Sequence, residues 1–235
     1  MSELLTYTLK GNVAEIELHN GKVNAFSPDF IEAIQGAMDQ AEKDEAAVLF
    51  IGKPGIFSAG YDLNVMRSGD VNAVADMIKA GSELCARLLA FPRPVVAAVT
   101  GHCMAQGVMH ILACDYVVGT EGEFTLGLNE TQIGMIMPWY GIELAKGRFA
   151  QDVINRAVVH AELFDPQGAV DIGLLDKIAS PESVLEVARA ETQRLAELDK
   201  VAFKGSKLRM RAGMIERMQD AKIQDDRDFR QGYSD

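Results

Sequence analysis

Short apolar runs alternate along this chain with stretches of helical periodicity, and this alternation restricts the possible folds more than any other feature. The strand-like runs lie at 4–10, 13–18, 47–51, 95–99 and 116–118. Helical spacing of apolar residues occurs at 27–43, 71–89 and 108–113, and along most of the chain after Pro138. Strands that alternate with helices pair largely in parallel, with right-handed crossovers and with functional loops at the carboxyl ends of the strands. The sequence therefore predicts an α/β fold, although it leaves the strand order open.

Turn and capping residues mark the ends of several elements. Gly11 and Asn12 separate two alternating runs and predict a β-hairpin. Ser27 followed by Pro28 is typical of the first turn of a helix. In the second half of the chain we expect helices at 139–149 and 151–161, a short turn at 165–166, and a long helix capped at Ser180. The helical tail carries methionines and an isoleucine that we expect in the core or in a subunit contact: Met210, Met214, Ile215 and Met218.

Composition excludes several classes of protein. The chain has 235 residues, a formal net charge of −11, and 48% hydrophobic residues, as in an ordinary globular protein. Such an acidic chain is not expected to bind nucleic acid, since that requires a basic surface. Residues 1–11 lack the features of a signal peptide, and the apolar runs are shorter than the ~18 residues that span a bilayer. We therefore expect a cytoplasmic protein with no membrane partner, whose cysteines are buried thiols: Cys85, Cys103 and Cys114.

Common catalytic motifs are absent from the sequence. The segment 55–60 lacks the Lys-Ser/Thr pair of a phosphate-binding loop, and Ile56 stands where a GxSxG nucleophile turn needs glycine. The sequence contains no GxGxxG segment, and its 4 histidines show no metal-ligand spacing. We therefore expect neither a metal nor a redox cofactor, and we interpret His110 as a hydrogen-bonded structural histidine.

Two strand-to-helix turns remain, at 57–63 and 101–107. Each is placed where the backbone bends tightly after a buried strand, and such turns leave amide groups without partners. Where two of them converge, their partial positive charge can stabilise an oxyanion. From their spacing alone, these turns could equally serve only to connect a strand to a helix.

In their order, spacing and flanking residues, these turns resemble the crotonase, or enoyl-CoA hydratase/isomerase, superfamily. Further blocks that look like family landmarks are 24–26, 94–101, 113–115 and 168–176, and the segment 127–134 followed by Pro138-Trp139 is most similar to the mitochondrial-type delta-3, delta-2 enoyl-CoA isomerases. The resemblance implies stacked ββα units with a helical C-terminal region. It divides the chain into a core with the acyl-CoA site at 1–180 and a helical region for packing and oligomerisation at 181–235. It also implies a homotrimer or dimer of trimers, with coenzyme A present only as part of the substrate.

The resemblance also implies the site. A thioester carbonyl would lie between the backbone amides of Tyr61 and Gln106, although relatives normally have glycine where this chain has Gln106. Of the two hydratase glutamates, the first corresponds to Met109 and the second to Glu130. A single base is enough to take a proton from C2 of a 3-enoyl-CoA and return it at C4, so the implied activity is isomerisation. The implied substrate-binding residues are Ala59, Gly60, Tyr61, Asp62, Leu63, Gln106 and Asn129.

The neighbours of Glu130 predict a dry pocket that raises its pKa toward neutrality: Leu128, Ile133, Met135, Ile136, Met137 and Trp139. Asp62 is expected to cap a helix. The cations that could meet coenzyme A phosphates are Lys22, Lys204, Lys207 and Arg209.

Two alternatives remain open. One is another crotonase reaction, 2-enoyl-CoA hydration or acyl-CoA thioester hydrolysis, with Asn129, Gln132 or His110 orienting water. The other is a non-catalytic acyl-CoA-binding protein, which would bind the ligand without turnover.

Overall fold

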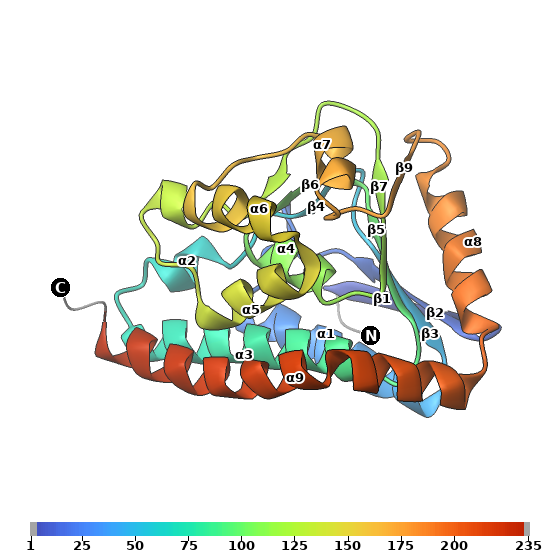
Figure 1. Cartoon of the computed structure of the whole chain (residues 1–235), viewed down its shortest axis with the longest axis horizontal. Coiled ribbons are helices and arrows are strands. Elements are labelled where there is room, and N and C mark those ends of the chain that lie inside the picture. Colours follow the sequence, from blue (N-terminus) through green and yellow to red (C-terminus); the bar gives the residue numbers. More distant parts are fainter. Residues whose placement is uncertain (1–3, 233–235) are drawn as a thin grey trace.

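A mostly parallel sheet forms the centre of the computed structural model, which describes residues 4–232 (Figure 1). In this range six strands pair in the order β1-β2-β3-β5-β7-β9. They are, in that order, Leu5–Lys10, Val13–Leu18, Ala47–Ile51, Val95–Val99, Tyr116–Thr120 and Lys177–Ala179. Only β1 and β2 pair antiparallel, as the predicted hairpin, and the other neighbours are parallel. The predicted α/β fold is confirmed.

Strand β3 shows why its sequence is apolar throughout. Val48 and Phe50 face the main core, whereas Ala47, Leu49 and Ile51 face a second, smaller core. Helix α8 (Val184–Ala196) covers that second face, where it packs on β3, β5 and β7 (Figure 1). A strand covered on both sides by helices needs apolar residues at every position, which is typical of parallel sheets.

A second sheet, which the sequence did not predict, contains β4 (Gly55–Ser58), β6 (Gly101–Met104) and β8 (Leu126–Gly127). All of its pairs are parallel. The predicted turn at 101–107 is therefore wrong in its first part, since β6 occupies it. Gly101 lies so close to β4 that a side-chain Cβ there would overlap the backbone of Gly55. This small sheet carries the two predicted turns at the ends of β4 and β6.

The helices follow the predicted pattern with a few shifts in their ends. They are α1 (Pro28–Lys43), α2 (Leu63–Met66), α3 (Val71–Ala90), α4 (Gln106–Leu112), α5 (Trp139–Arg148), α6 (Gln151–Ile154), α7 (Pro166–Asp171), α8 and α9 (Lys200–Gln231). Ser27 caps α1 as predicted, through its hydroxyl and the Phe30 amide. The helix predicted at 151–161 is wrong in its second half, where a π-helical turn spans Asn155–Val159. The predicted cap at Ser180 is also wrong, since residues 181–183 form turns and α8 begins after Ser183.

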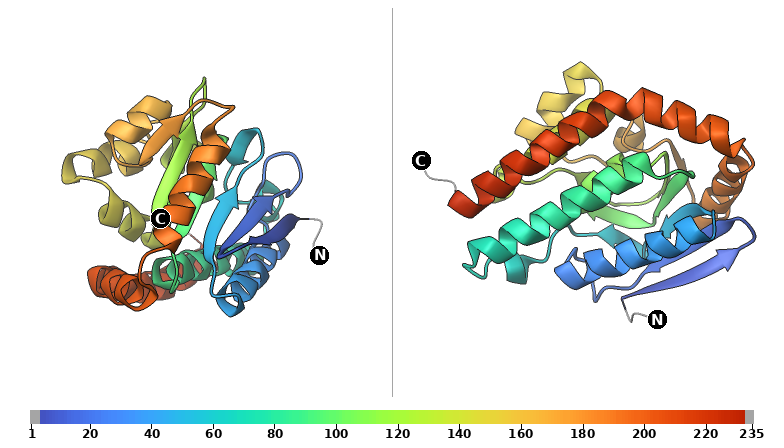
Figure 2. Two further views of the ribbon diagram at one scale, coloured as in Figure 1. Left: turned by 90° about the vertical axis from the view of Figure 1, so that its right-hand side faces the viewer. Right: turned by 90° about the horizontal axis from the view of Figure 1, so that it is seen from below.

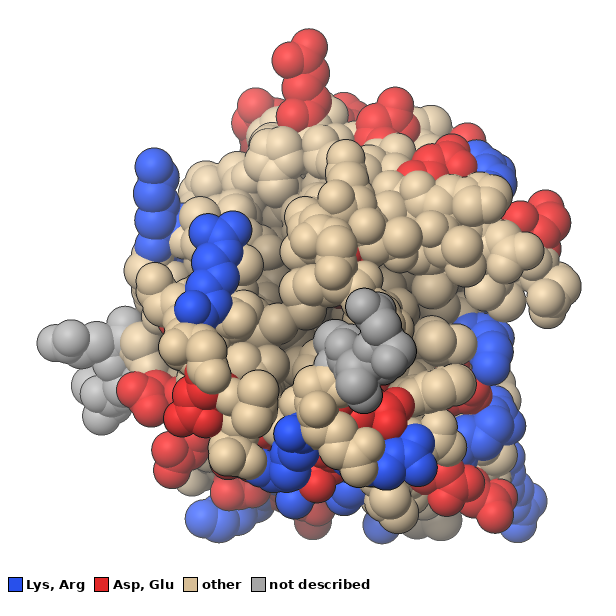
Figure 3. All heavy atoms as spheres, turned by 90° about the vertical axis from the view of Figure 1, so that its left-hand side faces the viewer, with Lys and Arg blue, Asp and Glu red and all other residues tan. Residues whose placement is uncertain are grey.

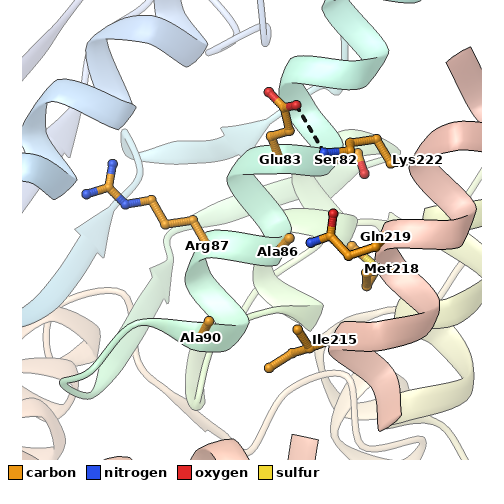
Figure 4. A pocket seen from close by; sticks show the side chains of 9 residues that line it. All are labelled: Ser82, Glu83, Ala86, Arg87, Ala90, Ile215, Met218, Gln219 and Lys222. Atoms are coloured by element: carbon orange, nitrogen blue, oxygen red, sulfur yellow. Dashed lines mark hydrogen bonds and ion pairs between the residues drawn. The ribbon is translucent and has the colours of Figure 1, made fainter. Parts of the chain in front are cut away.

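Helix α9 lies along α3, and α1 lies on the other side of α3, so that the three form one layer (Figure 2). Figure 4 shows α3 and α9 where Ala86 points toward Gln219 and Lys222 reaches Glu83, at 3.4 Å. Met218 is buried here, and Met214 and Ile215 pack against the main core. Met210 departs from the expectation of core packing, since it is 79% exposed.

The cysteines are buried and free, as predicted, and burial raises the pKa of each thiol. Between residues 4 and 232 no helix is long and apolar enough to cross a membrane. Within the same range, no cluster of three or more His, Cys, Asp or Glu side chains could hold a metal ion.

Candidate active site

The two predicted turns lie against each other. Gly60 has a φ of +99°, a conformation that favours glycine. A Cβ built on Gly60 would lie 2.8 Å from the Cβ of Ala105 and 3.5 Å from the backbone nitrogen of Gln106. Only glycine fits at this contact, and the contact brings the backbones of Tyr61 and Gln106 together.

The first turn is fixed by a short parallel bridge to the loop before α1. The amide of Phe26 donates to Gly60 O at 2.8 Å, and the amide of Asp62 donates to Phe26 O at 3.2 Å. The Ser58 hydroxyl accepts from the Gly60 amide at 3.1 Å. Between these bonds, the amide of Tyr61 has no acceptor within residues 4–232. The backbone thus presents one amide with no intramolecular partner.

The second turn places its strain one residue before Gln106. Ala105 has φ 51° and ψ −121°, whereas Gln106 is the first residue of α4. The substitution of glycine by Gln106 therefore does not require an unusual φ at Gln106 itself. An amide at the first position of a helix has no intrahelical acceptor. Gln106 can donate from its backbone as the resemblance implies, while Ala105 adopts a conformation that costs non-glycine residues about 1–3 kcal/mol.

A cavity of about 540 Å³ opens beside these turns. Its wall includes five of the predicted site residues: Ala59, Tyr61, Leu63, Asn129 and Glu130. Gly60, Asp62 and Gln106 belong to the adjoining turns but not to the wall. Asp62 caps α2 as predicted, since its carboxylate accepts from the Asn64 amide at 2.8 Å.

Glu130 is a buried carboxyl group on this wall, with 4% of its surface exposed. Its Oε2 atom is buried and has no hydrogen-bond partner among the residues that the structure describes. Burial raises the pKa of Glu130 to about 7. A carboxylate that is poorly solvated and has such a pKa is a stronger base than an ordinary glutamate, and it can exchange protons near neutral pH.

The apolar surroundings of Glu130 agree with the prediction only in part. Leu128 and Met137 are buried, but Ile133, Ile136 and Trp139 are 52%, 60% and 44% exposed. Of the predicted neighbours, Ile133 and Met135 line the cavity. Further apolar residues of its wall come from α2, α3 and α9, and sequence reasoning missed them: Met66, Val71, Val74 and Phe229. Figure 3 shows the side of the molecule on which α2 and the carboxyl end of α9 lie, where uncharged side chains fill the centre and charged ones gather along the lower edge. Nothing in the local sequence around Glu130 signals these distant contacts.

Met109 is fully buried and points into packing rather than into the cavity. A Cβ built on Gly141 of α5 would lie 3.1 Å from its Sδ and Cε atoms and 2.9 Å from Met137 Sδ. The position that corresponds to the first hydratase glutamate therefore holds a thioether in the core.

His110 is a structural residue, but it is not hydrogen-bonded as predicted. Both of its ring nitrogens are buried without a partner in the described part of the chain. Its ring centroid lies 5.5, 4.6 and 6.0 Å from those of Phe26, Phe50 and Phe57. Burial lowers the pKa of His110 to about 3. A neutral imidazole in an aromatic cluster away from the cavity wall is not placed to orient a water molecule there.

The cations proposed for coenzyme A phosphates do not line this cavity. Lys207 is 6% exposed and pairs with Asp115 at 2.7 Å, and Lys204 lines a different hollow at the start of α9. Lys22 and Arg209 are exposed elsewhere on the surface. The cation that does line the cavity is Arg67, just after α2.

Comparisons with known proteins agree with this geometry. A family model described as "Enoyl-CoA hydratase/isomerase" matches residues 8–234. The crystal structure of an enoyl-CoA hydratase/isomerase family protein from Pseudomonas syringae is 44% identical, with a TM-score of 0.94 over 96% of this chain and 98% of that one. Human mitochondrial enoyl-CoA delta isomerase 1 is 29% identical over 90% of this chain and 72% of the human protein. A probable enoyl-CoA hydratase of Bacillus subtilis is 28% identical over 79% of this chain and 73% of that protein.

Proposed function

The chain belongs to the enoyl-CoA hydratase/isomerase, or crotonase, family and has its fold, and on that premise we propose that it is an isomerase that moves the double bond of a 3-enoyl-CoA to the 2-position. The observation that carries this proposal is the single buried carboxyl group, Glu130, on the wall of the cavity. Met109 stands where a hydratase would supply a second carboxylate. One base is sufficient for a double-bond shift.

In the proposed reaction, the thioester oxygen accepts hydrogen bonds from the backbone amides of Tyr61 and Gln106. Glu130 removes a proton from C2, and the electrons of the C–H bond form a dienolate whose negative charge rests on that oxygen. The protonated Glu130 then returns the proton to C4, and the double bond forms between C2 and C3. Each oxyanion donor of this kind contributes about 3 kcal/mol to the stability of the transition state.

The pKa of Glu130 suits both halves of this cycle. A group that first accepts and then donates the same proton works best when its pKa lies near the working pH. Burial raises the pKa of Glu130 to about 7, so near neutrality the group is partly deprotonated and becomes a competent acid once it has taken the C2 proton. A solvated glutamic acid would instead lose this proton to water before it could protonate C4.

Hydration and thioester hydrolysis remain the competing reactions, because both isomerase and hydratase names occur among the relatives. Either reaction needs a group that orients water. Asn129 lies on the cavity wall, whereas Gln132 is exposed and does not line it. A non-catalytic acyl-CoA-binding protein is the remaining alternative, and it predicts binding without turnover.

The test follows the ultraviolet absorbance of the conjugated 2-enoyl thioester as a 3-enoyl-CoA is converted, with 2-enoyl-CoA hydration and free thiol release measured in parallel. The native protein is compared with Glu130→Gln and with Glu123→Gln, which alters an exposed glutamate outside the cavity. We expect isomerisation by the native protein and by Glu123→Gln. Loss of the Glu130 carboxyl should reduce it by 10²–10⁴-fold while acyl-CoA still binds. Water addition or thiol release as the faster reaction would replace the isomerase assignment, and binding without any turnover would identify an acyl-CoA-binding protein.

The proposal includes a cytoplasmic homotrimer or dimer of trimers that uses coenzyme A only as part of its substrate. Light scattering tests the assembly, since it should give three or six times the mass of one chain. A stable monomer would contradict this part of the proposal and leave the chemistry of Glu130 unaffected.

A further inference from the structure

Tyr61 and Gln106, whose amides are proposed to hold the thioester oxygen, are also joined through their side chains. The Tyr61 hydroxyl lies 2.7 Å from the hydroxyl of Tyr140, the second residue of α5. Tyr140 Oη in turn donates to Gln106 Oε1. Tyr140 and Gln106 are fully buried. A chain of polar side chains within the core therefore connects the two turns.

The protons in this series of hydrogen-bonded side chains have one consistent arrangement. The amide oxygen of Gln106 can only accept, so the proton of Tyr140 lies between Tyr140 and Gln106. The proton between the two hydroxyls must then come from Tyr61, which donates to Tyr140 at 2.7 Å and has a more distant second acceptor, the backbone oxygen of Ile78, at 3.3 Å. Burial raises the pKa of both phenols, so each keeps the proton that it donates. The Gln106 Nε2 continues the chain to Cys85 Sγ at 3.8 Å. Hydrogen bonds that run in one direction in a dry interior strengthen one another.

Helix α3 leaves space for the Tyr61 hydroxyl. Gly81 lies in the interior of α3, and a Cβ built there would overlap the Tyr61 hydroxyl. Glycine inside a helix is unfavourable compared with alanine. The absence of a side chain at Gly81 is thus explained by the position of the Tyr61 hydroxyl.

The backbone that carries the Tyr140 side chain is also held by hydrogen bonds. The carboxylate of Asp225 in α9 accepts from the backbone amides of Trp139 and Tyr140, at 2.8 and 3.1 Å. Asp225 is 2% exposed and anchors the first turn of α5 to α9. Tyr140 therefore projects from a helix end that is itself held in place.

We propose that Tyr140 is a positioning residue for the oxyanion hole, because its hydroxyl fixes the side chains of Tyr61 and Gln106 and thereby the orientation of their two backbone amides. The inference rests on the proposed function, since Tyr140 acts only through the two donors. Glycine at the position of Gln106 would have no side chain to anchor. In this chain the buried Gln106 amide holds the first residue after the strained Ala105, so loss of its partner leaves a buried acceptor unsatisfied and allows the turn to shift.

The first experiment uses Tyr140→Phe, which keeps the ring and removes the hydroxyl. Oxyanion contacts are stronger in the transition state than in the bound substrate, so the variant should lose roughly tenfold or more in kcat with little change in KM. The matched control is Tyr7→Phe, which removes a hydroxyl that donates to Asp44 at 2.6 Å outside the cavity. The control should keep the native kcat.

A second readout does not depend on turnover. The infrared band of the thioester carbonyl, measured with a saturated acyl-CoA carrying ¹³C at that carbon, reports how strongly the bound oxygen is polarised. We expect a shift to lower frequency in the native protein and in Tyr7→Phe, and a smaller shift in Tyr140→Phe. Gln106→Met removes the acceptor at similar length and should give the same loss, so it replaces Tyr140→Phe if that variant does not fold.

The outcomes separate the two proposals. A native kcat and a native carbonyl shift in folded Tyr140→Phe or Gln106→Met would overturn the role of Tyr140. A native protein that shifts the carbonyl band but does not isomerise 3-enoyl-CoA would overturn the proposed function, and the band in Tyr140→Phe would still decide whether Tyr140 positions the donors.

Discussion

The turn at Gly60 and the turn at Ala105 present similar backbone amides but differ in how their backbone conformations are stabilised. Each ends a strand of the small sheet and presents one backbone amide toward a shared space. In the first turn, a glycine adopts φ +99° at little steric cost, and in the second an alanine is held at φ 51° and ψ −121°. Glycine adopts the conformation of Gly60 without strain, whereas the surrounding contacts hold Ala105 in a conformation that alanine disfavours. An unfavourable conformation persists only where neighbouring contacts determine it, and here those contacts include the buried Gln106.

Substitution of Gly60 should have the largest effect on the contact between the two turns. In Gly60→Ala, a new Cβ would lie 2.8 Å from the Cβ of Ala105, and the residue would keep a φ that alanine disfavours. Overpacking and backbone strain together should lower the free energy of unfolding by about 4 kcal/mol, with loss of isomerase activity. Urea denaturation measures the change, and Gly36→Ala, at an open position in α1, should not destabilise the protein. An unchanged unfolding midpoint in Gly60→Ala would show that the contact between the turns is loose.

A second test separates backbone strain from the cost of burying Glu130. The folded-state pKa of about 7 exceeds the ordinary value of 4.5, so between these values the folded protein binds more protons than the unfolded chain. Stability contributed by Glu130 is therefore lost as the pH rises through this window, by about 3 kcal/mol in total. Glu130→Gln should be more stable than the native protein at pH 8 by about this amount, and the difference should disappear near pH 4. Thermal or urea unfolding at both pH values measures it, and a difference independent of pH would contradict the burial argument.

The same pKa predicts the pH dependence of the reaction. In the proposed reaction only the deprotonated form of Glu130 can remove the C2 proton, so kcat/KM should rise through a pKa of about 7 and level off above it. Between pH 5 and pH 8 we expect an increase of about a hundredfold. Initial rates of conjugated product formation across this range test the prediction. A midpoint near 4.5 would place the base in contact with solvent during the reaction.

Removal of the strain at Ala105 should have the smallest effect. Ala105→Gly makes the second turn resemble the first and relieves its strain, so the free energy of unfolding should rise by about 1 kcal/mol at every pH. Ala33→Gly, in the interior of α1, should lower it by a similar amount or more, because there glycine adds freedom to the unfolded chain and removes a methyl group that packs against the main core. Equal destabilisation of both variants would mean that Ala105 carries no strain.

Sequence reasoning succeeded where the cause of a structure is local. The hydroxyl of Ser27 and the ring of Pro28 act within one helical turn, and α1 begins there. The central strands of the large sheet were also evident, since burial on both faces requires continuous apolar runs. By contrast, β8 has two residues and exists only because it pairs with β6, which no local pattern reveals.

The site divides in the same way. The segment that carries Glu130 and the two turns could be found from motifs, because their residues are adjacent in sequence. The strain lies at Ala105 instead of Gln106 because a backbone angle depends on how β6 and α4 are joined in space. Phe229 reaches the cavity because α9 runs along α3, and this packing brings together residues that are far apart in the chain. The side chains of Ile136 and Trp139 are exposed and do not line the cavity, so apolar neighbours in sequence need not be neighbours in space.

The placement of Phe229 and Gly232 on the cavity wall also bears on the order in which the protein matures. Synthesis proceeds from the amino terminus, and segments begin to fold as they emerge. The turns at Gly60 and Ala105, Glu130 and the whole large sheet precede α9, so a nascent chain can assemble the proposed catalytic groups before the wall of the cavity is complete. The cavity closes only when α9 docks along α3. Full substrate binding is thus acquired in the final step of folding, and a ribosome-bound fragment that ends before α9 should hold acyl-CoA more weakly than the finished protein.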